Sequence, residues 1–152
     1  MQYNAFVEWE KFLGEENFSV LSEILAAGIK NFKTVDSKEK IETISVVICT
    51  RNRPAALEKC IRSLLNNDDK NFELIVVDNA PDNDDTKKIV EQFPGVRYVF
   101  EERKGLDIAR NTGAKTASHN IIAYTDDDVQ IPANWIANIK SCFANPLTMA
   151  VT

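Results

Sequence analysis

The stretch ISVVICTRNRP, residues 44–54, joins an apolar run to a polar turn and decides the fold class. No charge interrupts the run from Ile44 to Cys49, as expected for a strand of a parallel sheet that is covered on both faces. Pro54 suits the first turn of a helix, and apolar residues then recur at helical spacing as far as Leu65. The stretch therefore predicts one strand followed by one helix.

The same alternation continues downstream of this first unit. Apolar runs predict strands over 72–77, 96–100 and 121–125, and helical spacing predicts helices over 84–93, after Gly105, and from Pro132 to about 145. On the helix after Gly105, the small residues Ala109, Gly113 and Ala117 form a stripe that would allow close approach to the sheet. We expect an α/β fold with a Rossmann-like, mostly parallel sheet flanked by helices.

Residues 1–40 have a different pattern, in which two short amphipathic helices are expected. We therefore divide the chain into a helical N-terminal extension, 1–40, and a main domain, 41–152. The extension is interpreted as a helical cap on the core, with a partner-binding helical pair as the alternative.

Composition excludes several classes of protein. The chain has 152 residues, of which 44% are hydrophobic, and these suffice for one compact domain. A net charge of −5 argues against sequence-independent binding to nucleic acid. The three cysteines lack metal-ligand spacing, and there is neither a signal peptide nor an apolar run of the roughly 18 residues that a spanning helix needs. We expect a cytoplasmic chain with reduced thiols, and peripheral association with the inner face of a membrane is left open.

Polar residues gather where the predicted strands end. Because ligands bind beyond the carboxyl ends of the strands in such sheets, these residues are expected to share one rim. They are Thr50, Arg51 and Asn52 after the first strand, Asp78, Asn79 and Asp82 after the second, Arg103, Lys104 and Asp107 after the third, and Asp126, Asp127 and Asp128 after the fourth.

The acidic triplet Asp126–Asp128 follows a buried strand directly. Three adjacent carboxylates repel one another unless a cation lies among them, and hard oxygen ligands suit Mg²⁺ or Mn²⁺. On extended backbone Asp126 and Asp128 point to the same side, so this pair is the predicted metal site. The alternative is a solvated acidic turn.

Two further residues are candidates with structural alternatives. Asp78 could accept hydrogen bonds from a base or ribose, or it could simply form a turn by bonding backbone amides. Arg110 is expected near the ligand edge of the sheet, whereas a salt bridge to Asp107 would give it a structural role.

Four linked motifs, in this order and spacing, resemble the family 2 glycosyltransferases of GT-A fold. The motifs are SVVICTRNRP (45–54), ELIVVDN (73–79), GLDIARNTG (105–113) and TDDD (125–128). The resemblance covers residue 44 to the C-terminus and identifies the chain as the N-terminal, donor-binding part of such an enzyme.

The resemblance implies transfer of a sugar, with inversion, from a nucleotide-diphospho-sugar donor to a saccharide or other hydroxyl acceptor. It assigns the nucleotide to Thr50, Arg51, Asn52, Asp78, Arg110, Asp126 and Asp127, with Asp78 at the base edge and Arg110 close to the base or diphosphate. It assigns Mn²⁺ or Mg²⁺, bridging the diphosphate, to Asp126 and Asp128, as in the D-x-D motif of the family. A divalent ion stabilises the charge of the leaving diphosphate.

The family's general base belongs to a later motif, and the 24 residues after Asp128 contain no Asp, Glu or His. The catalytic residue is therefore unknown from this sequence, and the general base is expected beyond Thr152. We expect this chain to be truncated relative to the enzyme, able to bind donor and metal but inactive alone.

Two alternatives remain at this point. A haloacid-dehalogenase-like phosphatase would use Asp126 as nucleophile in a D-x-D-x-[TV] motif, but that motif belongs on the first strand of its fold. A noncatalytic nucleotide-sugar-binding or assembly module would use the same pocket without transfer.

Overall fold

The computed structural model describes residues 43–145 and 148–151, so the helical extension expected over 1–40 lies outside the described residues. Thr152, beyond which the general base is expected, also lies outside them, and that expectation stays a prediction.

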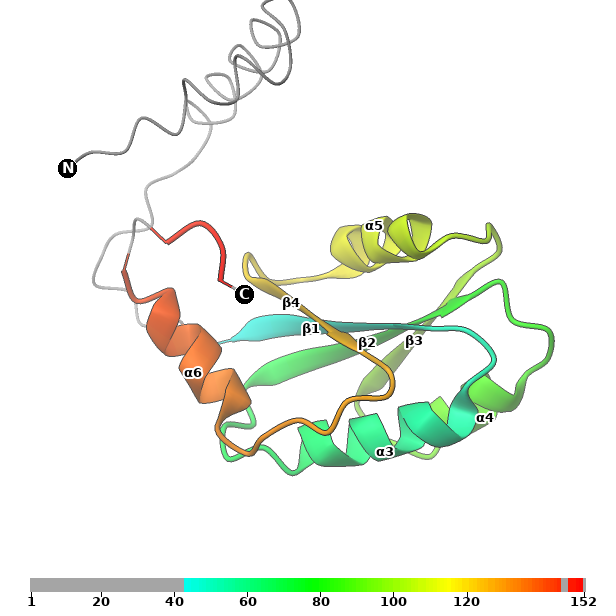
Figure 1. Ribbon diagram of the computed structural model, residues 1–152, viewed down its shortest axis with the longest axis horizontal. Helices are drawn as coiled ribbons and strands as arrows, with labels where there is room; N and C mark the ends of the chain where they lie inside the picture. The colour runs from blue at the N-terminus through cyan, green and yellow to red at the C-terminus, as the bar shows by residue number, and fades with distance from the viewer. Residues whose placement is uncertain (1–42, 146–147, 152) are drawn as a thin grey trace, which may run out of the picture. The chain divides into compact units, whose positions relative to one another are not determined.

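Four parallel strands form one sheet in the order β3-β2-β1-β4 (Figure 1). The elements in chain order are β1 (Ile44–Thr50), α3 (Pro54–Leu65), β2 (Phe72–Asn79), α4 (Asp85–Val90), β3 (Val96–Glu101), α5 (Leu106–Thr116), β4 (Ile122–Asp126) and α6 (Trp135–Cys142). The predicted α/β class with a parallel sheet is confirmed.

The two faces of the sheet carry cores of different size. Helices α3 and α4 lie on one face and α5 on the other, as Figure 1 shows. The larger core joins alternate residues of β1, β2 and β4 to one side of α3, where Leu57, Cys60, Ile61 and Leu64 recur at helical spacing. The smaller core lies under α5 and contains Val47, Ile75, Val77 and Ala109.

Gly113 allows α5 to lie close to the sheet. It is buried, and a Cβ at this position would collide with Cγ1 of Val47 and lie 3.4 Å from Cγ2 of Val77. The small-residue stripe predicted on this helix therefore has the expected effect, because only a residue without a side chain fits at its centre.

The strand register brings the polar strand ends level with one another. Thr50 pairs with Asp78, Cys49 with Asp126, and Asn79 with Glu101. Parallel strands end at the same edge of a sheet, so residues up to 77 positions apart in sequence become neighbours there.

Element boundaries differ from the predicted ones by a few residues. Each strand continues past its apolar run into one or two polar residues, because ladder pairing does not require an apolar side chain. Helix α6 begins at Trp135 rather than Pro132, since the N–H of Trp135 donates to the Pro132 carbonyl in a preceding turn. Among the described residues, no helix combines the length and apolar character needed to cross a bilayer.

Candidate functional site

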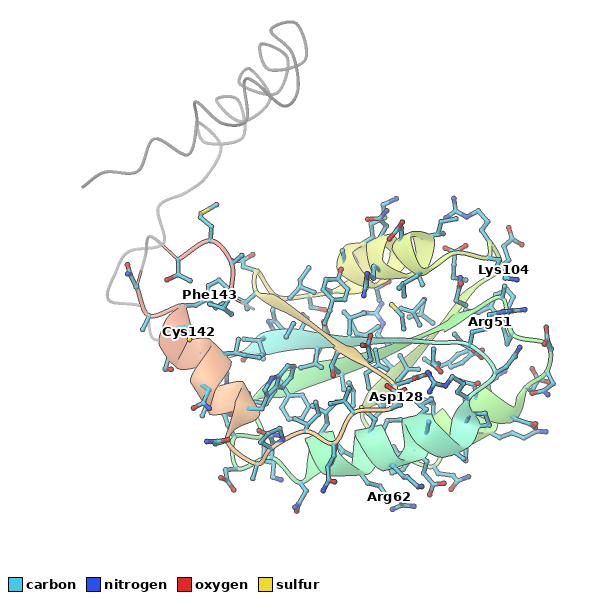
Figure 2. All side chains as sticks on the ribbon, in the orientation of Figure 1. Arg51, Arg62, Lys104, Asp128, Cys142 and Phe143 are labelled. Atoms are coloured by element: carbon cyan, nitrogen blue, oxygen red, sulfur yellow. The ribbon has the colours of Figure 1, made fainter. Side chains whose placement is uncertain are left out.

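A pocket of about 440 Å³ opens at the carboxyl edge of the sheet. Residues at the carboxyl ends of β1, β2 and β4 line it together with the loop between β3 and α5, which confirms that these segments meet. The lining residues are Cys49, Thr50, Arg51, Arg53, Asn79, Lys104, Gly105, Leu106, Ala109, Asp126, Asp127 and Asp128. Figure 2 labels Arg51, Lys104 and Asp128 around this end of the molecule.

Asp127 ties the end of β4 to the end of β1. Its side chain is buried, with Oδ2 accepting a hydrogen bond of 2.6 Å from the Thr50 hydroxyl and Oδ1 lying 2.8 Å from a guanidinium nitrogen of Arg53. Charge-assisted bonds of this kind satisfy a buried carboxylate. Asp127 is therefore held by contacts within the protein itself.

Asp126 and Asp128 flank this anchor and are both exposed. The backbone is extended only as far as Asp126, the last residue of β4, and turns at Asp127 and Asp128, so the extended geometry expected for this pair does not hold. The other guanidinium nitrogen of Arg53 lies 2.7 Å from Asp128 Oδ2, and this bond lowers the pKa of Asp128 below its ordinary value. Asp126 forms no side-chain hydrogen bond or ion pair within the described residues. Both carboxylates are therefore accessible to a ligand from outside the core.

The donor set of this acidic triplet fits a hard divalent ion. All its ligand atoms are carboxylate oxygens, which suit Mg²⁺ or Mn²⁺. In the described part of the chain, however, no three Asp, Glu, His or Cys side chains converge on one point. An ion at Asp126 and Asp128 would thus complete its shell with water and with oxygens of a bound ligand, as Mg²⁺ usually does at phosphorylated substrates.

Arg51 and Asn52 connect the loop after β1 to the loop after β2. Arg51 Nε donates to the carbonyl of Ala80 at 3.0 Å, and both residues bond the carboxylate of Asp82. Asn52 and Ala80 have positive φ angles of 55° and 47°, which are uncommon for residues with a Cβ. Such backbone conformations cluster at functional sites because surrounding contacts hold them in place.

Three predicted site residues, Asn52, Asp78 and Arg110, do not line the pocket. Asp78 is fully buried, where its Oδ2 accepts a 3.0 Å bond from the Tyr98 hydroxyl, and its Oδ1 has no hydrogen-bond partner among the described residues. Burial raises the pKa of Asp78 above its ordinary value. Arg110 is exposed on α5, and its carbonyl accepts a bond from the Tyr124 hydroxyl.

The loop between β3 and α5, residues 102–105, is fixed by two buried side chains. Asn79 donates to the carbonyl of Arg103 at 2.7 Å and accepts from the N–H of Gly105 at 2.9 Å. Glu101 accepts three bonds from Arg103 and one from Thr112, which lower its pKa to about 2. This loop therefore has a defined conformation before any ligand binds.

Cys49 and Cys60 belong to the packing around the site. Burial raises the pKa of both thiols to about 11, so neither is a thiolate at neutral pH. Cys60 donates to the carbonyl of Asp126 at 3.4 Å from beneath the acidic triplet. Cys60 is buried in the core, whereas Cys49 is half-buried and lines the pocket.

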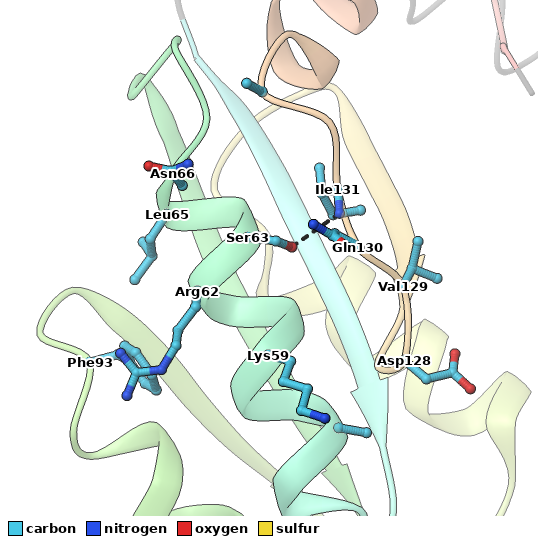
Figure 3. A pocket seen from close by; sticks show the side chains of 12 residues that line it. Lys59, Arg62, Ser63, Leu65, Asn66, Phe93, Asp128, Val129, Gln130 and Ile131 are labelled. Atoms are coloured by element: carbon cyan, nitrogen blue, oxygen red, sulfur yellow. Dashed lines mark hydrogen bonds between the residues drawn. The ribbon is translucent and has the colours of Figure 1, made fainter.

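A second, larger pocket of about 1060 Å³ lies between α3 and the segment after β4 (Figure 3). Ser63 accepts the N–H of Ile131 across it, and Arg62 lies over the Phe93 ring at 5.1 Å from the centroid. Only Asp128 belongs to both pockets. The strand-end pocket is the candidate site because it gathers the ends of β1, β2 and β4 and the loop after β3.

Sequence reasoning missed the roles of three residues at this edge. Arg53 pairs with carboxylates 74 and 75 positions away, Asn79 bonds the loop before α5, and Glu101 holds Arg103. Arg53 and Asn79 were visible within the quoted motifs, but only the spatial contacts reveal what they hold.

Comparison with known proteins bears directly on this site. The model of the glycosyl transferase family 2 matches residues 45–151. The chain is 33% identical over 94 residues to a GalNAc(5)-diNAcBac-PP-undecaprenol beta-1,3-glucosyltransferase of Campylobacter jejuni, covering 58% of this chain and 30% of that protein. It is 30% identical over 113 residues to a validoxylamine A glucosyltransferase of Streptomyces hygroscopicus, covering 70% and 26%. The chain thus spans less than a third of the length of these relatives.

Solved structures agree with the fold. TarS of S. aureus superimposes with a TM-score of 0.61 at 23% identity, covering 66% of this chain and 32% of that chain. The mannosyltransferase PcManGT of Pyrobaculum calidifontis, solved with GDP-Man and Mn²⁺, gives a TM-score of 0.58 at 26% identity, covering 69% and 33%. With four motifs, a matching family model and a GT-A-like sheet in agreement, this chain belongs to glycosyl transferase family 2.

Proposed function

We propose that the strand-end pocket binds a nucleotide-diphospho-sugar, and that the full-length enzyme transfers the sugar, with inversion, to an acceptor hydroxyl. The observation that carries this proposal is the acidic triplet, in which Asp127 is anchored internally while Asp126 and Asp128 remain exposed at the pocket. Such an arrangement leaves two carboxylates for a ligand without leaving a buried charge unpaired.

Asp126 and Asp128 would hold Mn²⁺ or Mg²⁺. When bound, the ion supplies positive charge that stabilises the leaving nucleoside diphosphate. PcManGT, which shares the fold, was solved with GDP-Man and Mn²⁺ and supports this part of the proposal.

The remaining candidates divide by position. Thr50, Arg51, Asn52 and Asp127 would position the nucleoside and ribose, because they lie at or beside the pocket. Thr50 is bonded to Asp127, and both Arg51 and Asn52 are bonded to Asp82. Contacts of Asp78 with the base and of Arg110 with the base or diphosphate stay predictions from the family resemblance, since neither residue lines the pocket.

The general base and the acceptor site are proposed to lie beyond Thr152, in a part of the enzyme outside residues 41–152. The described residues that follow Asp128 include no Asp, Glu or His, which supports this placement. One relative acts, by its name, on an undecaprenol-linked glycan and another on validoxylamine A, so these names favour no single acceptor. Peripheral membrane association would follow if the acceptor were lipid-linked.

Titration of the chain with UDP, GDP and dTDP, with and without Mn²⁺, tests the proposal. We expect metal-dependent binding that Asp128→Ala weakens at least about tenfold, while Asp85→Ala on α4 serves as the control. Metal-independent binding that survives Asp128→Ala would favour the noncatalytic module. Phosphorylation of Asp126 by an acyl phosphate would favour the phosphatase, against which family membership argues.

A further inference from the structure

The strand-end pocket contains three cations, and two of them are already paired. Arg53 contacts Asp127 and Asp128, and Arg51 contacts Asp82 and the carbonyl of Ala80. Lys104 lines the same pocket and forms no hydrogen bond or ion pair with any described residue. It is therefore the lining cation whose charge no described carboxylate neutralises.

The backbone around Lys104 is held on both sides. Asn79 bonds the carbonyl of the residue before it, Arg103, and the N–H of the residue after it, Gly105. Gly105 has a φ of 153°, and a Cβ there would lie 3.3 Å from Ile108, so the turn favours glycine. Glu101 fixes Arg103 by three further bonds.

Of the two cations in the loop 102–105, this arrangement leaves Lys104 free to adjust to a ligand. Arg103, its cationic neighbour, is committed to Glu101 at 2.9 Å. Figure 2 labels Lys104 at the same end of the molecule as Arg51. An ammonium group on a pinned backbone reaches an anion with little ordering cost, because the loop is already formed.

We infer that Lys104 binds the diphosphate of the nucleotide donor, and that Asn79 positions it. The inference rests on the proposed function, and it names a phosphate-binding residue that the family resemblance did not assign. The donor diphosphate carries two negative charges, and the leaving nucleoside diphosphate gains a further one. Because the carboxylates of Asp126 and Asp128 would already offset the charge of a divalent ion held there, the uncommitted ammonium of Lys104 complements that ion.

The test compares nucleotides that differ only in phosphate. With Mn²⁺ present, affinities for uridine, UMP and UDP are measured for the wild-type chain, Lys104→Gln and Lys104→Arg, with GDP and guanosine in parallel. Lys115→Gln is the matched control, because Lys115 is an exposed lysine in the last turn of α5 outside the pocket.

We expect Lys104→Gln to weaken diphosphate binding about tenfold, because one bond to a charged group is lost. Nucleoside binding should stay unchanged. Lys104→Arg should retain most of the affinity, and Lys115→Gln all of it. If Lys104→Gln weakened the binding of nucleoside and diphosphate equally, or bound diphosphate with wild-type affinity, the inference about Lys104 would be overturned and the proposed function would stand. Absence of any nucleotide binding by the wild-type chain would instead overturn the proposed function.

Discussion

Two strand ends of this sheet each carry a buried carboxylate bonded to an arginine, yet they differ in what they leave for a ligand. At the end of β3, the Glu101 carboxylate accepts hydrogen bonds from Arg103 and Thr112 and, among residues 43–145 and 148–151, from no other residue. At the end of β4, Asp127 accepts a hydrogen bond from Thr50 and forms an ion pair with Arg53, and the exposed carboxylates of Asp126 and Asp128 flank it. The carboxylate at the end of β3 only holds the structure together, whereas the acidic triplet at the end of β4 also leaves two carboxylates that could bind a ligand.

The comparison also explains why arginine serves both ends. A guanidinium group can bond two oxygens at fixed geometry, so it holds one carboxylate or spans two adjacent ones. Nε and Nη2 of Arg103 both bond Glu101, whereas Nη1 of Arg53 contacts Asp127 and Nη2 contacts Asp128. Spanning two carboxylates reduces repulsion within the acidic triplet before any metal binds.

The largest difference between the two ends should appear when one hydroxyl is removed from each. Thr50→Val leaves Oδ2 of buried Asp127 without its 2.6 Å donor and is expected to lower the free energy of unfolding by about 1–3 kcal/mol. Thr112→Val is the matched control, because Glu101 keeps three bonds from Arg103.

Urea unfolding of both variants measures this difference. We expect Thr112→Val to lower the free energy of unfolding by less than Thr50→Val does. Equal losses, or a larger loss for Thr112→Val, would mean that the two carboxylates do not differ in how completely they are satisfied.

A smaller effect is expected in the pH dependence of the free energy of unfolding, to which Glu101 at the end of β3 contributes. The bonds from Arg103 and Thr112 lower the pKa of Glu101 from 4.5 to about 2. A carboxyl group with a depressed folded-state pKa stabilises the protein above its unfolded pKa, and this contribution is lost as the pH falls from about 4.5 towards 2. Glu101→Gln should therefore flatten the decline of unfolding free energy in that window.

Chemical unfolding between pH 2 and 5 follows this change, with Glu102→Gln as the control on the exposed neighbouring residue. A decline that is as steep in Glu101→Gln as in the wild-type chain would show that Glu101 does not carry it.

The core of this fold was predictable because parallel strands buried on both faces are continuous apolar runs, as in residues 44–49 and 74–77. The place of the site was predictable too, because the carboxyl ends of such strands meet at one edge. The pairing of Arg53 with Asp127 and Asp128 was not, because most of the domain separates it from them in sequence. Local sequence patterns do not predict which residue, distant in sequence, a side chain contacts.

Asp78 and Asn79 show what position along a strand leaves undetermined. The ligand contact of Asp78 stays a prediction, and its side chain points to the face covered by α3 and α4, where it accepts a hydrogen bond from Tyr98. Asn79, one residue later, points to the opposite face and lines the pocket. The alternation of side chains along a strand thus separates two residues whose positions in the motif are almost the same.

The central claim is that a divalent ion and a nucleoside diphosphate bind together at the acidic triplet. Paramagnetic broadening of backbone amide signals by Mn²⁺ in the presence of UDP or GDP measures this directly. The account predicts selective broadening at Thr50, Gly105 and Asp126–Asp128, with α6 (Trp135–Cys142) unaffected, and its loss in Asp128→Ala. Broadening centred elsewhere, or broadening at the triplet that persists in Asp128→Ala, would contradict it.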